Sequence, residues 1–410
     1  MKNQKTFFKS GITLVVSLLF FVSISFSQKN NLRVGNWRAT LKLNDSTELP
    51  FNFEVKYDLD IYSIDFINAK ERITTNEIAI QKDSVFIKMP IFDSEFRCKN
   101  MGDSLTGVWI NHARKSKNII PFKALYGFKF VPTKPLEFTK RYKVTFEPNT
   151  KDEYFAVGEF KSVSGHATGT FQTETGDYRY LEGFFAFGTF ELSCFDGAHA
   201  FLFTADEKGD SLINGNFYSG AHGHETFIAV EDEKFQLRNP DSLTYMKPGF
   251  TKVDFNFKNL EGKTISLKDE KFKNKVVIIQ IMGSWCPNCM DETKFLAPFY
   301  DTYKSKGLEV VGLAFERTDD FNKAVTNVER LKKRFGANYE FLITMKTGAD
   351  QASEALPMLN KVMAFPTTIY IDKKGVVRKI YTGFYGPATG DKYSQYVEET
   401  TRFVEKLLAE

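Results

Sequence analysis

The chain has 410 residues, of which 42% are hydrophobic, and this is enough apolar material for two or three domains with separate cores. Its formal net charge is +4, and Lys2, Lys5 and Lys9 supply three of these charges, so the rest of the chain is nearly neutral. A nearly neutral chain lacks the electrostatic footprint of proteins that bind nucleic acid or anionic membranes, and we expect neither partner.

Residues 1–27 have the pattern of a secretory signal peptide. Three lysines precede an apolar segment at 12–26, and small residues at 23–28 offer a cleavage site. The apolar segment is shorter than the about 20 residues that a membrane span needs, and no cysteine follows it to carry a lipid. We therefore expect export to the periplasm without a stable membrane anchor, with association with the outer surface as an alternative.

Residues 28–245 are predicted to be rich in β-strands. Segments such as 37–43 and 49–55 alternate apolar and polar residues, and Gly, Asn and Asp turns separate them. The chain contains 42 phenylalanines, and those at alternating strand positions are expected to fill the interior of the sheets.

This β-rich region contains a weak internal repeat. Residues 102–109, which begin Gly-Asp-Ser-Leu, resemble residues 209–217. Either two duplicated antiparallel barrels, at 28–135 and 136–245, or one composite barrel would explain the repeat. A closed barrel would also leave no exposed sheet edge.

The histidines and cysteines of the β-rich region do not indicate a catalytic site. His222 and His224 have the spacing of metal ligands on a strand, but the glycines around them favour a turn, and we expect no metal. Cys98 and Cys194 have two interpretations, a structural disulfide in an oxidising compartment or buried free thiols. Neither is expected to take part in catalysis.

The pattern changes at 243–249, a predicted linker that contains proline and glycine, and beyond it strands alternate with helices. Residues 276–281 form an apolar, β-branched run typical of a buried parallel strand, and 292–304 is predicted to be helical. Residues 248–410 are therefore expected to form an α/β domain. The other expected elements are strands at 308–314, 341–343, 367–371 and 376–380, and helices at 319–335, 352–361 and 393–408.

Residues 285–289 read Trp-Cys-Pro-Asn-Cys and lie where the predicted strand turns into the helix. A thiolate at a helix N-terminus is stabilised by free backbone N–H groups, and Pro287 fits the first turn. We expect Cys286 to be the exposed attacking thiol and Cys289 the buried resolving thiol. A fixed disulfide is the structural alternative, whereas a zinc site lacks ligands, since no His follows His224 and no other Cys follows Cys194.

The segment from about residue 247 to the C-terminus resembles the TlpA/ResA-like branch of the thioredoxin superfamily. The resemblance rests on Trp285 before the two cysteines, on Glu292 three residues after Cys289, and on the segments 254–262 and 365–368. It implies a thioredoxin fold and thiol–disulfide oxidoreductase activity with no cofactor. It does not extend to the first 245 residues.

The resemblance also implies roles for residues near the two cysteines. Pro366 is expected to be cis and to face the disulfide, so that the backbone of Phe365 offers an edge to an extended substrate. Trp285, Pro287 and Phe365 are the expected substrate-binding residues.

The chain departs from thioredoxin at Gln280, where cytosolic members of the superfamily bury a carboxylate. Glu292, one helical turn after Cys289, is the remaining candidate to accept the proton of the resolving thiol, and a solvated helix residue is the alternative. Asn288 carries no positive charge and Glu292 adds a negative one. Both effects disfavour the thiolate at Cys286, which indicates a reductase rather than an oxidase or isomerase.

The sequence therefore predicts an exported thiol–disulfide oxidoreductase that reduces disulfides of substrate proteins and receives electrons from an upstream donor. A different class of function remains open. In that alternative, the β-rich region is a periplasmic or surface binding module and the thioredoxin domain is an accessory.

Overall fold

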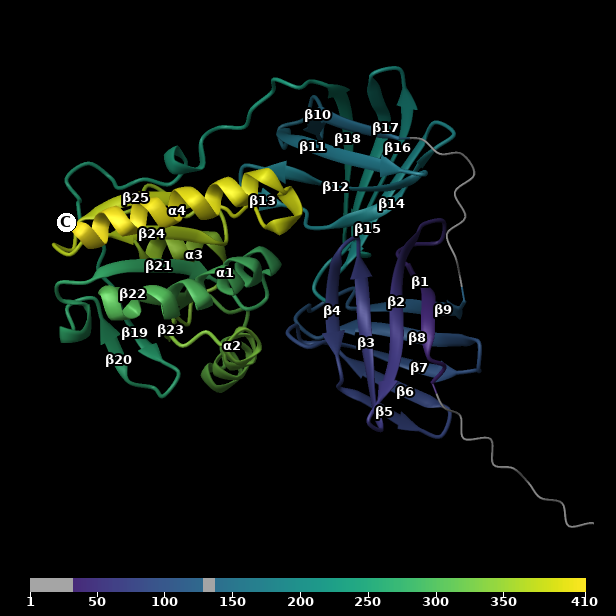
Figure 1. Cartoon of the computed structure of the whole chain (residues 1–410), viewed down its shortest axis with the longest axis horizontal. Helices are drawn as coiled ribbons and strands as arrows, with labels where there is room; N and C mark the ends of the chain where they lie inside the picture. The colour runs from purple at the N-terminus through teal and green to yellow at the C-terminus, as the bar shows by residue number, and fades with distance from the viewer. Residues whose placement is uncertain (1–31, 128–136) are drawn as a thin grey trace, which may run out of the picture.

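The computed structural model describes residues 32–127 and 137–410. The expected signal peptide at 1–27 and the expected boundary between the two repeats near residue 135 lie outside the described residues. Within them, two nine-stranded sheets precede a seven-stranded sheet with helices (Figure 1).

The first sheet is a nearly closed antiparallel barrel. Its strands are β1 Gly35–Lys42, β2 Glu48–Asp58, β3 Ile61–Asn68, β4 Glu71–Thr75, β5 Ile78–Gln81, β6 Ser84–Lys88, β7 Ser94–Asn100, β8 Ser104–Asn111 and β9 Ile119–Tyr126. The first strand pairs with the last, and β4 and β5 form the two edges.

The second sheet closes completely. Its strands are β10 Phe138–Phe146, β11 Tyr154–Val163, β12 His166–Thr173, β13 Gly176–Asp177, β14 Leu181–Ala186, β15 Thr189–Phe195, β16 Ala200–Lys208, β17 Ser211–Ser219 and β18 Gly223–Glu231. Strand β10 pairs with β18, and β11 pairs with both β10 and β12, so the ladder returns on itself. The short strand β13 extends from the end of β12.

The two sheets place the repeated segments at equivalent positions. Residues 102–109 lead into β8 and residues 209–217 into β17, and each of these strands precedes the one that pairs with the first strand of its sheet. The described residues thus form two barrel-like sheets, and their origin by duplication stays a prediction.

Phenylalanines fill the interiors of both sheets, as the alternation predicted. In the second sheet the rings of Phe171 and Phe203 stack with centroids 4.4 Å apart. Phe195 of β15, in the second sheet, packs on Phe51 of the first sheet, with ring centroids 4.6 Å apart. The two sheets therefore share part of a core.

The two cysteines of the β-rich region are free thiols. Cys98 is buried in the core of the first sheet and Cys194 in that of the second. Of the two interpretations of these residues, the structure has the buried free thiols.

The third sheet has the strand order β20-β19-β23-β22-β21-β24-β25. Its strands are β19 Asn256–Asn259, β20 Thr264–Ser266, β21 Val276–Met282, β22 Leu308–Ala314, β23 Glu340–Ile343, β24 Thr367–Ile371 and β25 Val377–Thr382. The helices are α1 Pro287–Tyr303, α2 Phe321–Phe335, α3 Gly348–Ala355 and α4 Asp391–Ala409, with short 3-10 helices at Pro240–Ser242, Glu270–Phe272, Lys304–Lys306 and Pro387–Thr389. No helix in the described ranges is long and apolar enough to cross a membrane.

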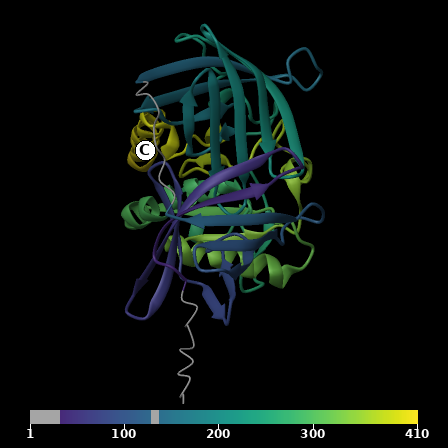
Figure 2. The ribbon, with the colours of Figure 1, turned by 90° about the vertical axis from the view of Figure 1, so that its right-hand side faces the viewer.

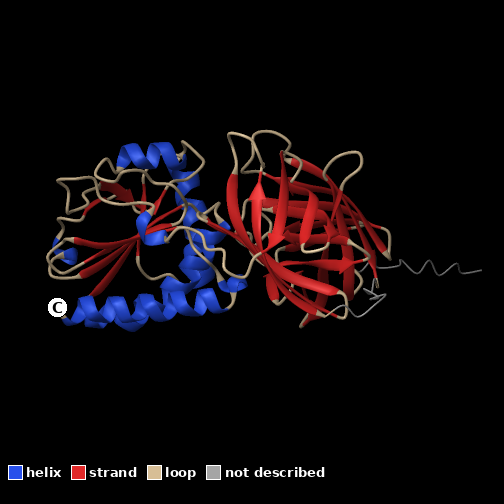
Figure 3. Ribbon diagram, turned by 90° about the horizontal axis from the view of Figure 1, so that it is seen from above, coloured by secondary structure: helices blue, strands red, loops and turns tan. Residues whose placement is uncertain are grey.

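Strand β21 lies inside this sheet, between β22 and β24, and all seven of its residues are buried. It runs parallel to β22 and antiparallel to β24, as in a thioredoxin fold. Helices α1, α2 and α4 pack with Ile278 on one face, and α3 packs with Ile279 on the other. Figure 3 shows the α-helices confined to this half of the molecule.

One expected helix is placed wrongly by the sequence analysis. The prediction of 352–361 is replaced by α3, which begins at Gly348 and ends at Ala355. Leu356 has φ −124° and ψ 65°, outside the helical region. It precedes Pro357, whose ring disfavours a helical conformation in the residue before it.

Both β sheets face the thioredoxin-fold domain. Seen from their side, strands β10–β18 stand above β1–β9, with the helical domain behind them (Figure 2). The short strand β13 reaches from the second sheet to the ends of α1 and α4 (Figure 1). The contacts at this junction determine what can reach the two cysteines.

Candidate active site

Cys286 lies between strand β21, which ends at Met282, and helix α1, which begins at Pro287. It is the N-cap, with an extended backbone at φ −101° and ψ 112°, and Pro287 occupies the first turn, where its missing N–H costs no hydrogen bond. The backbone N–H of Cys289 donates to Cys286 Sγ at 3.3 Å. A thiolate at Cys286 is therefore stabilised by a backbone N–H and by the positive end of the helix dipole.

Cys289 lies one turn further along α1 and is fully buried. Burial, together with its contact with the sulfur of Cys286, raises the pKa of the Cys289 thiol well above its usual range. At neutral pH Cys289 is therefore a protonated thiol, and it needs a base before it can act as a nucleophile.

Glu292 is buried, so the alternative of a solvated helix residue is wrong. Its Oε1 accepts hydrogen bonds from the hydroxyls of Thr368 and Tyr396, while its Oε2 has no hydrogen-bond partner among the described residues. Burial raises the pKa of Glu292 to about 7, although these hydroxyls favour the ionised form. A carboxyl group with this pKa can gain and lose a proton near neutral pH.

Gln280 occupies the interior position at which thioredoxin has its carboxylate. It is fully buried, and its side-chain amide donates to the carbonyl of Cys289 and to the hydroxyl of Thr293, both at 3.2 Å. An amide holds the helix against the sheet but cannot take a proton from Cys289. This leaves Glu292 as the ionisable group one turn from that thiol.

Phe365 and Pro366 lie beside the first cysteine, and the peptide bond between them is cis. Cys286 Sγ donates to the carbonyl oxygen of Phe365 at 3.4 Å. The ring of Phe365 meets that of Trp285 edge-on, with centroids 5.5 Å apart, and the indole N–H of Trp285 donates to the carbonyl of Phe315 at 2.9 Å.

Trp285, Cys286 and Phe365 line a cavity of about 330 Å³, which we call the catalytic cavity. The predicted site residues on its wall are Trp285, Cys286, Pro287 and Phe365. Cys289, Glu292 and Pro366 are not among its lining residues, and all three are buried in the domain. The fold therefore separates a surface that can meet a substrate from an interior that can handle the proton.

The second sheet supplies the opposite wall of the catalytic cavity. Residues 175–178, at the turn from β12 into β13, face the dithiol, together with His199 and Phe201. Cys286 consequently retains only 7% of its surface, so the expectation of an exposed thiol needs correction. The second sheet covers the thiol of Cys286, and the Trp-Cys-Pro-Asn-Cys motif at 285–289 does not indicate where that sheet lies.

Backbone and side-chain hydrogen bonds hold this cover in place. Asn288, between the two cysteines, donates through its side-chain amide to the carbonyl of Asp177 at 3.1 Å. The hydroxyl of Tyr385 donates to the carbonyl of Thr173 at 2.9 Å. The N–H of Gly386 donates to the carboxylate of Asp177 at 2.5 Å.

Arg179 joins the two β-rich sheets to helix α1 through a buried ionic network. Its side chain has no exposed surface and pairs with Asp291 of α1, Glu71 of the first sheet and Asp196 of the second. It also donates to the carbonyl of Pro287 at 3.1 Å. Burial alone would lower the pKa of Arg179, but the three carboxylates raise it well above its usual range, so the guanidinium stays charged.

The sequence analysis missed Arg179, Asp177 and Arg317. No local spacing connects the first two with α1, since their partners lie more than 100 positions away. Arg317 did leave a signal, because it follows β22 as Cys286 follows the parallel neighbour β21. The carboxyl ends of adjacent parallel strands meet at one edge of a sheet, where α/β proteins bind their ligands.

Comparison with known proteins identifies the C-terminal part of the chain. The family described as Redoxin matches residues 247–395. The thiol-disulfide oxidoreductase ResA of Geobacillus thermodenitrificans is 31% identical over 140 residues, which are 34% of this chain and 72% of that protein. ResA of Bacillus thuringiensis subsp. konkukian is 30% identical over 156 residues, or 38% of this chain and 80% of that protein.

Solved structures with a similar domain include a thiol:disulfide interchange protein of the thioredoxin family from Chlorobium tepidum. It is 22% identical, with a TM-score of 0.29, and the match covers 40% of this chain and 99% of that one. A thiol-disulfide oxidoreductase from Bacteroides fragilis is 17% identical, with a TM-score of 0.28, and the match covers 36% and 99% of the two chains.

The similarity to ResA extends over most of the length of those relatives and coincides with the domain that carries the two cysteines. Through its C-terminal domain, this chain belongs to the ResA family of thiol-disulfide oxidoreductases.

Proposed function

We propose that this chain is an exported reductase that transfers electrons from the Cys286–Cys289 dithiol to disulfides of substrate proteins. The observation that carries the proposal is the order of three groups along α1. Cys286 caps the helix beside a cavity, Cys289 is buried one turn later, and Glu292 is buried one turn beyond it. This order supports attack by the first thiol, resolution by the second and proton transfer by the carboxyl group.

In the proposed reaction, the Cys286 thiolate attacks one sulfur of the substrate disulfide. The substrate disulfide bond breaks, and the sulfur that was not attacked leaves as a thiolate. The attacked sulfur forms a mixed disulfide with Cys286. Ionised Glu292 then accepts the proton of Cys289, whose sulfur attacks Cys286 Sγ. The second substrate sulfur leaves, two electrons have passed to the substrate, and an upstream dithiol donor must reduce the new Cys286–Cys289 disulfide.

The charges around Cys286 bear on the direction of electron transfer. Asn288 is neutral, and its amide is already engaged by Asp177, so nothing between the cysteines adds a positive charge. Arg317 acts in the opposite sense, because its attraction to Cys286 favours the thiolate. We propose the reductase direction, since Arg317 lies over the ring of Trp285 rather than between the cysteines.

A redox titration tests this direction. Equilibrating the chain with dithiothreitol or glutathione buffers and counting the free thiols of Cys286 and Cys289 gives the reduction potential. A reductase should lie near the about −270 mV of thioredoxin, whereas a value near the about −120 mV of DsbA would favour the alternative oxidase.

Export and the role of the β-rich region belong to the same proposal. The segment 1–27 supports export, and N-terminal sequencing of the protein from a periplasmic fraction tests it. The β-rich region supplies a wall of the catalytic cavity, which supports a role in substrate selection over that of an independent binding module.

A further inference from the structure

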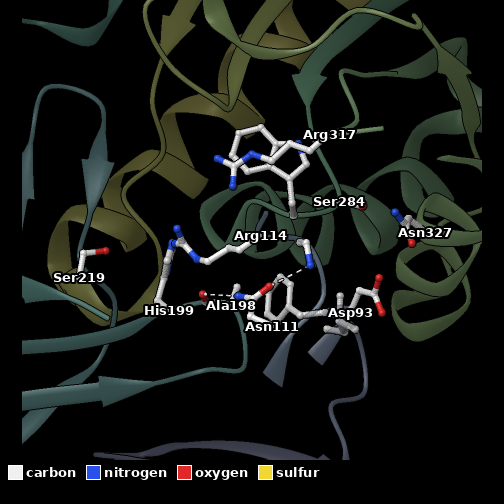
Figure 4. A pocket seen from close by; sticks show the side chains of 13 residues that line it. Asp93, Asn111, Arg114, Ala198, His199, Ser219, Ser284, Arg317 and Asn327 are labelled. Atoms are coloured by element: carbon white, nitrogen blue, oxygen red, sulfur yellow. Dashed lines mark hydrogen bonds between the residues drawn. The ribbon is translucent and has the colours of Figure 1, made fainter. Parts of the chain in front are cut away.

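A second cavity adjoins the catalytic cavity. It measures about 130 Å³ and shares Trp285 and His199 with its neighbour, and we call it the arginine cavity. Its lining residues come from both β sheets and from the thioredoxin-fold domain. The side chains of Arg114 and Arg317 reach into it from ribbons of different domains (Figure 4).

The two arginines converge from distant parts of the chain. Arg114 lies in the loop between β8 and β9 of the first sheet, and Arg317 follows β22. The guanidinium carbon of Arg317 lies 3.6 Å from the centroid of the Trp285 ring. Trp285 directly precedes the attacking thiol Cys286, so a residue on the wall of the arginine cavity is the sequence neighbour of the reacting cysteine.

The carboxylates around the cavity form their ion pairs and hydrogen bonds with other groups, although Glu316 also attracts Arg317 at longer range. Asp93 lines the cavity and pairs with Lys323 at 3.6 Å. Glu316 accepts hydrogen bonds from the backbone N–H and the hydroxyl of Ser284, at 2.7 and 2.6 Å. Within the ranges 32–127 and 137–410, no carboxylate lies within ion-pair distance of either arginine of the cavity.

The electrostatics of neighbouring groups indicate an excess of positive charge here. Burial lowers the pKa of Arg114, and the charge of Arg317 lowers it further. Burial also lowers the pKa of His222 to about 4, with a further contribution from Arg114. Arg114 is half-buried and Arg317 is exposed, and Glu316 attracts Arg317 without forming an ion pair with it. Two guanidinium groups that repel each other and lack a paired carboxylate favour the entry of an anion, because an anion offsets the repulsion and the desolvation of Arg114.

We infer that the arginine cavity binds a carboxylate of the substrate, and that the preferred substrate class is a disulfide with an acidic residue beside its cystine. The inference rests on the proposed function. Aspartate and glutamate carry the side-chain carboxylates of an unmodified protein, and guanidinium groups bind carboxylates through paired hydrogen bonds. Arg114 belongs to the β-rich region, so this region would select the substrate of the thioredoxin-fold domain.

The carboxylate takes no part in the redox step. Two electrons still pass from Cys286 and Cys289 to the substrate disulfide. The two substrate sulfurs leave as thiolates and take up protons from solvent or from Glu292, which received the proton of Cys289. In the assay, dithiothreitol reduces the Cys286–Cys289 disulfide and is itself oxidised. The bound carboxylate only holds the substrate disulfide against Cys286.

The test uses the full chain and two disulfide-bonded peptides that differ by one residue, aspartate or asparagine, beside the cystine. We expect kcat/KM to be about tenfold higher for the aspartate peptide, the factor expected of one charge-assisted hydrogen bond. Arg114→Gln should remove most of this preference. Lys115→Gln is the matched control, because it removes the same charge from an exposed neighbour that does not line the cavity, and it should keep the preference.

Different outcomes separate this inference from the proposed function. If the chain reduces both peptides at equal rates, or if Arg114→Gln keeps the preference, the carboxylate site is wrong while the reductase stands. If the chain reduces neither peptide, the proposed function itself fails. The preference should also decrease as the salt concentration rises, since it is electrostatic.

A third substrate identifies the source of the carboxylate. Oxidised glutathione carries carboxylates on a small molecule, and its reduction should be compared in the wild-type chain and in Arg114→Gln. A rate that depends on Arg114 supports the site and admits small disulfides as substrates. A rate independent of Arg114, with the peptide preference intact, supports the site and restricts it to longer chains.

Discussion

Glu292 shows how burial changes the chemistry of one residue. Its Oε1 is held by two hydroxyls from β24 and α4, while its Oε2 faces the interior without a partner in the described part of the chain. The negative charge of this carboxylate would raise the pKa of Cys289, which is the effect expected of a proton acceptor close to that thiol. The raised pKa of Glu292, about 7, lets the group change protonation state under ordinary conditions.

The first prediction concerns the rate at which the mixed disulfide is resolved. Glu292→Gln should slow the attack of Cys289 on Cys286 about a hundredfold, because general-base catalysis contributes roughly that factor. In the wild type this rate should rise with pH through about 7, where Glu292 ionises. The variant should lack this rise of the rate with pH. Single-turnover kinetics measure it. Glu329→Gln, an exposed glutamate of α2, is the control, and equal rates for Glu292→Gln and wild type would exclude the role of base.

The second prediction concerns stability. The pKa of Glu292 rises from an ordinary 4.5 to about 7 on folding, so the folded state keeps a proton that the unfolded chain releases between these values. Its contribution to the free energy of unfolding is present below about pH 4.5 and is lost as the pH rises to about 7. Glu292→Gln lacks this loss. Between about pH 4.5 and 7 its free energy of unfolding should therefore increase by about 2–4 kcal/mol relative to that of the wild type, as measured by denaturant unfolding. A constant difference would contradict the buried, titrating carboxyl group.

At the scale of single residues, the sequence predicted part of the site. The two thiols and Pro287 form a local unit, so their placement at the start of α1 follows from neighbouring residues alone. The environment of Glu292 does not, because Thr368 and Tyr396 lie 76 and 104 positions away. For this reason a solvated residue remained an alternative until the fold was known.

At the scale of elements, the turn from β12 into β13 controls access to Cys286. Gly176 adopts φ +138° in this turn, and a Cβ there would lie 2.3 Å from Nδ2 of Asn288, which donates to Asp177. The turn therefore fits against α1 only because this residue is glycine.

The third prediction follows from this contact. Gly176→Ala should move the turn away from Asn288 and make Cys286 react several-fold faster with iodoacetamide, as measured by mass spectrometry of the labelled thiol. Gly209→Ala is the matched control in the same sheet, since its φ is also positive, at +61°, but a Cβ there meets nothing within 4 Å. The control should leave the labelling rate unchanged. Equal rates in both variants would show that the turn does not cover the thiol.

The sequence predicted most elements of the thioredoxin-fold domain but not this turn. Strand β22 has the bounds predicted for it, Leu308–Ala314. The turn at β13 has only two paired residues, and its role depends on a neighbour in another domain. Hydrophobic periodicity does not report such contacts.

At the scale of the whole molecule, Arg179 connects the two barrels with the active-site helix. Its three carboxylate partners belong to β4, to the segment after β15 and to α1. Buried charges are costly unless they are paired, so the network fixes one arrangement of the three sheets. Phe195, packed into the core of the first sheet, reinforces it.

The fourth prediction concerns this network. Arg179→Met should lower the free energy of unfolding by about 3–5 kcal/mol, because it removes the guanidinium that the buried Asp291 and Asp196 and the half-buried Glu71 share. Arg238→Met, which breaks an exposed pair with Glu174, should cost less than about 1 kcal/mol. Denaturant unfolding of both variants measures the difference. Similar losses in the two variants would mean that the buried network adds no stability.

The composition and repeat of the chain indicated a β-rich region followed by an α/β domain, and the structure has both. The alternation that predicts strands shows which face is buried, but not what packs against the ends of a barrel. The enclosure of Cys286 therefore became visible only with the full arrangement of sheets.

The most direct test of the central claim, that Cys286 attacks and Cys289 resolves, is mixed-disulfide trapping with Cys289→Ser in the full chain. After incubation with a periplasmic extract, mass spectrometry should find substrate proteins bound covalently to Cys286. Cys286→Ser should trap none, because Cys289 has no exposed surface. Adducts on Cys289 in Cys286→Ser, with none in Cys289→Ser, would contradict the assignment of the two thiols.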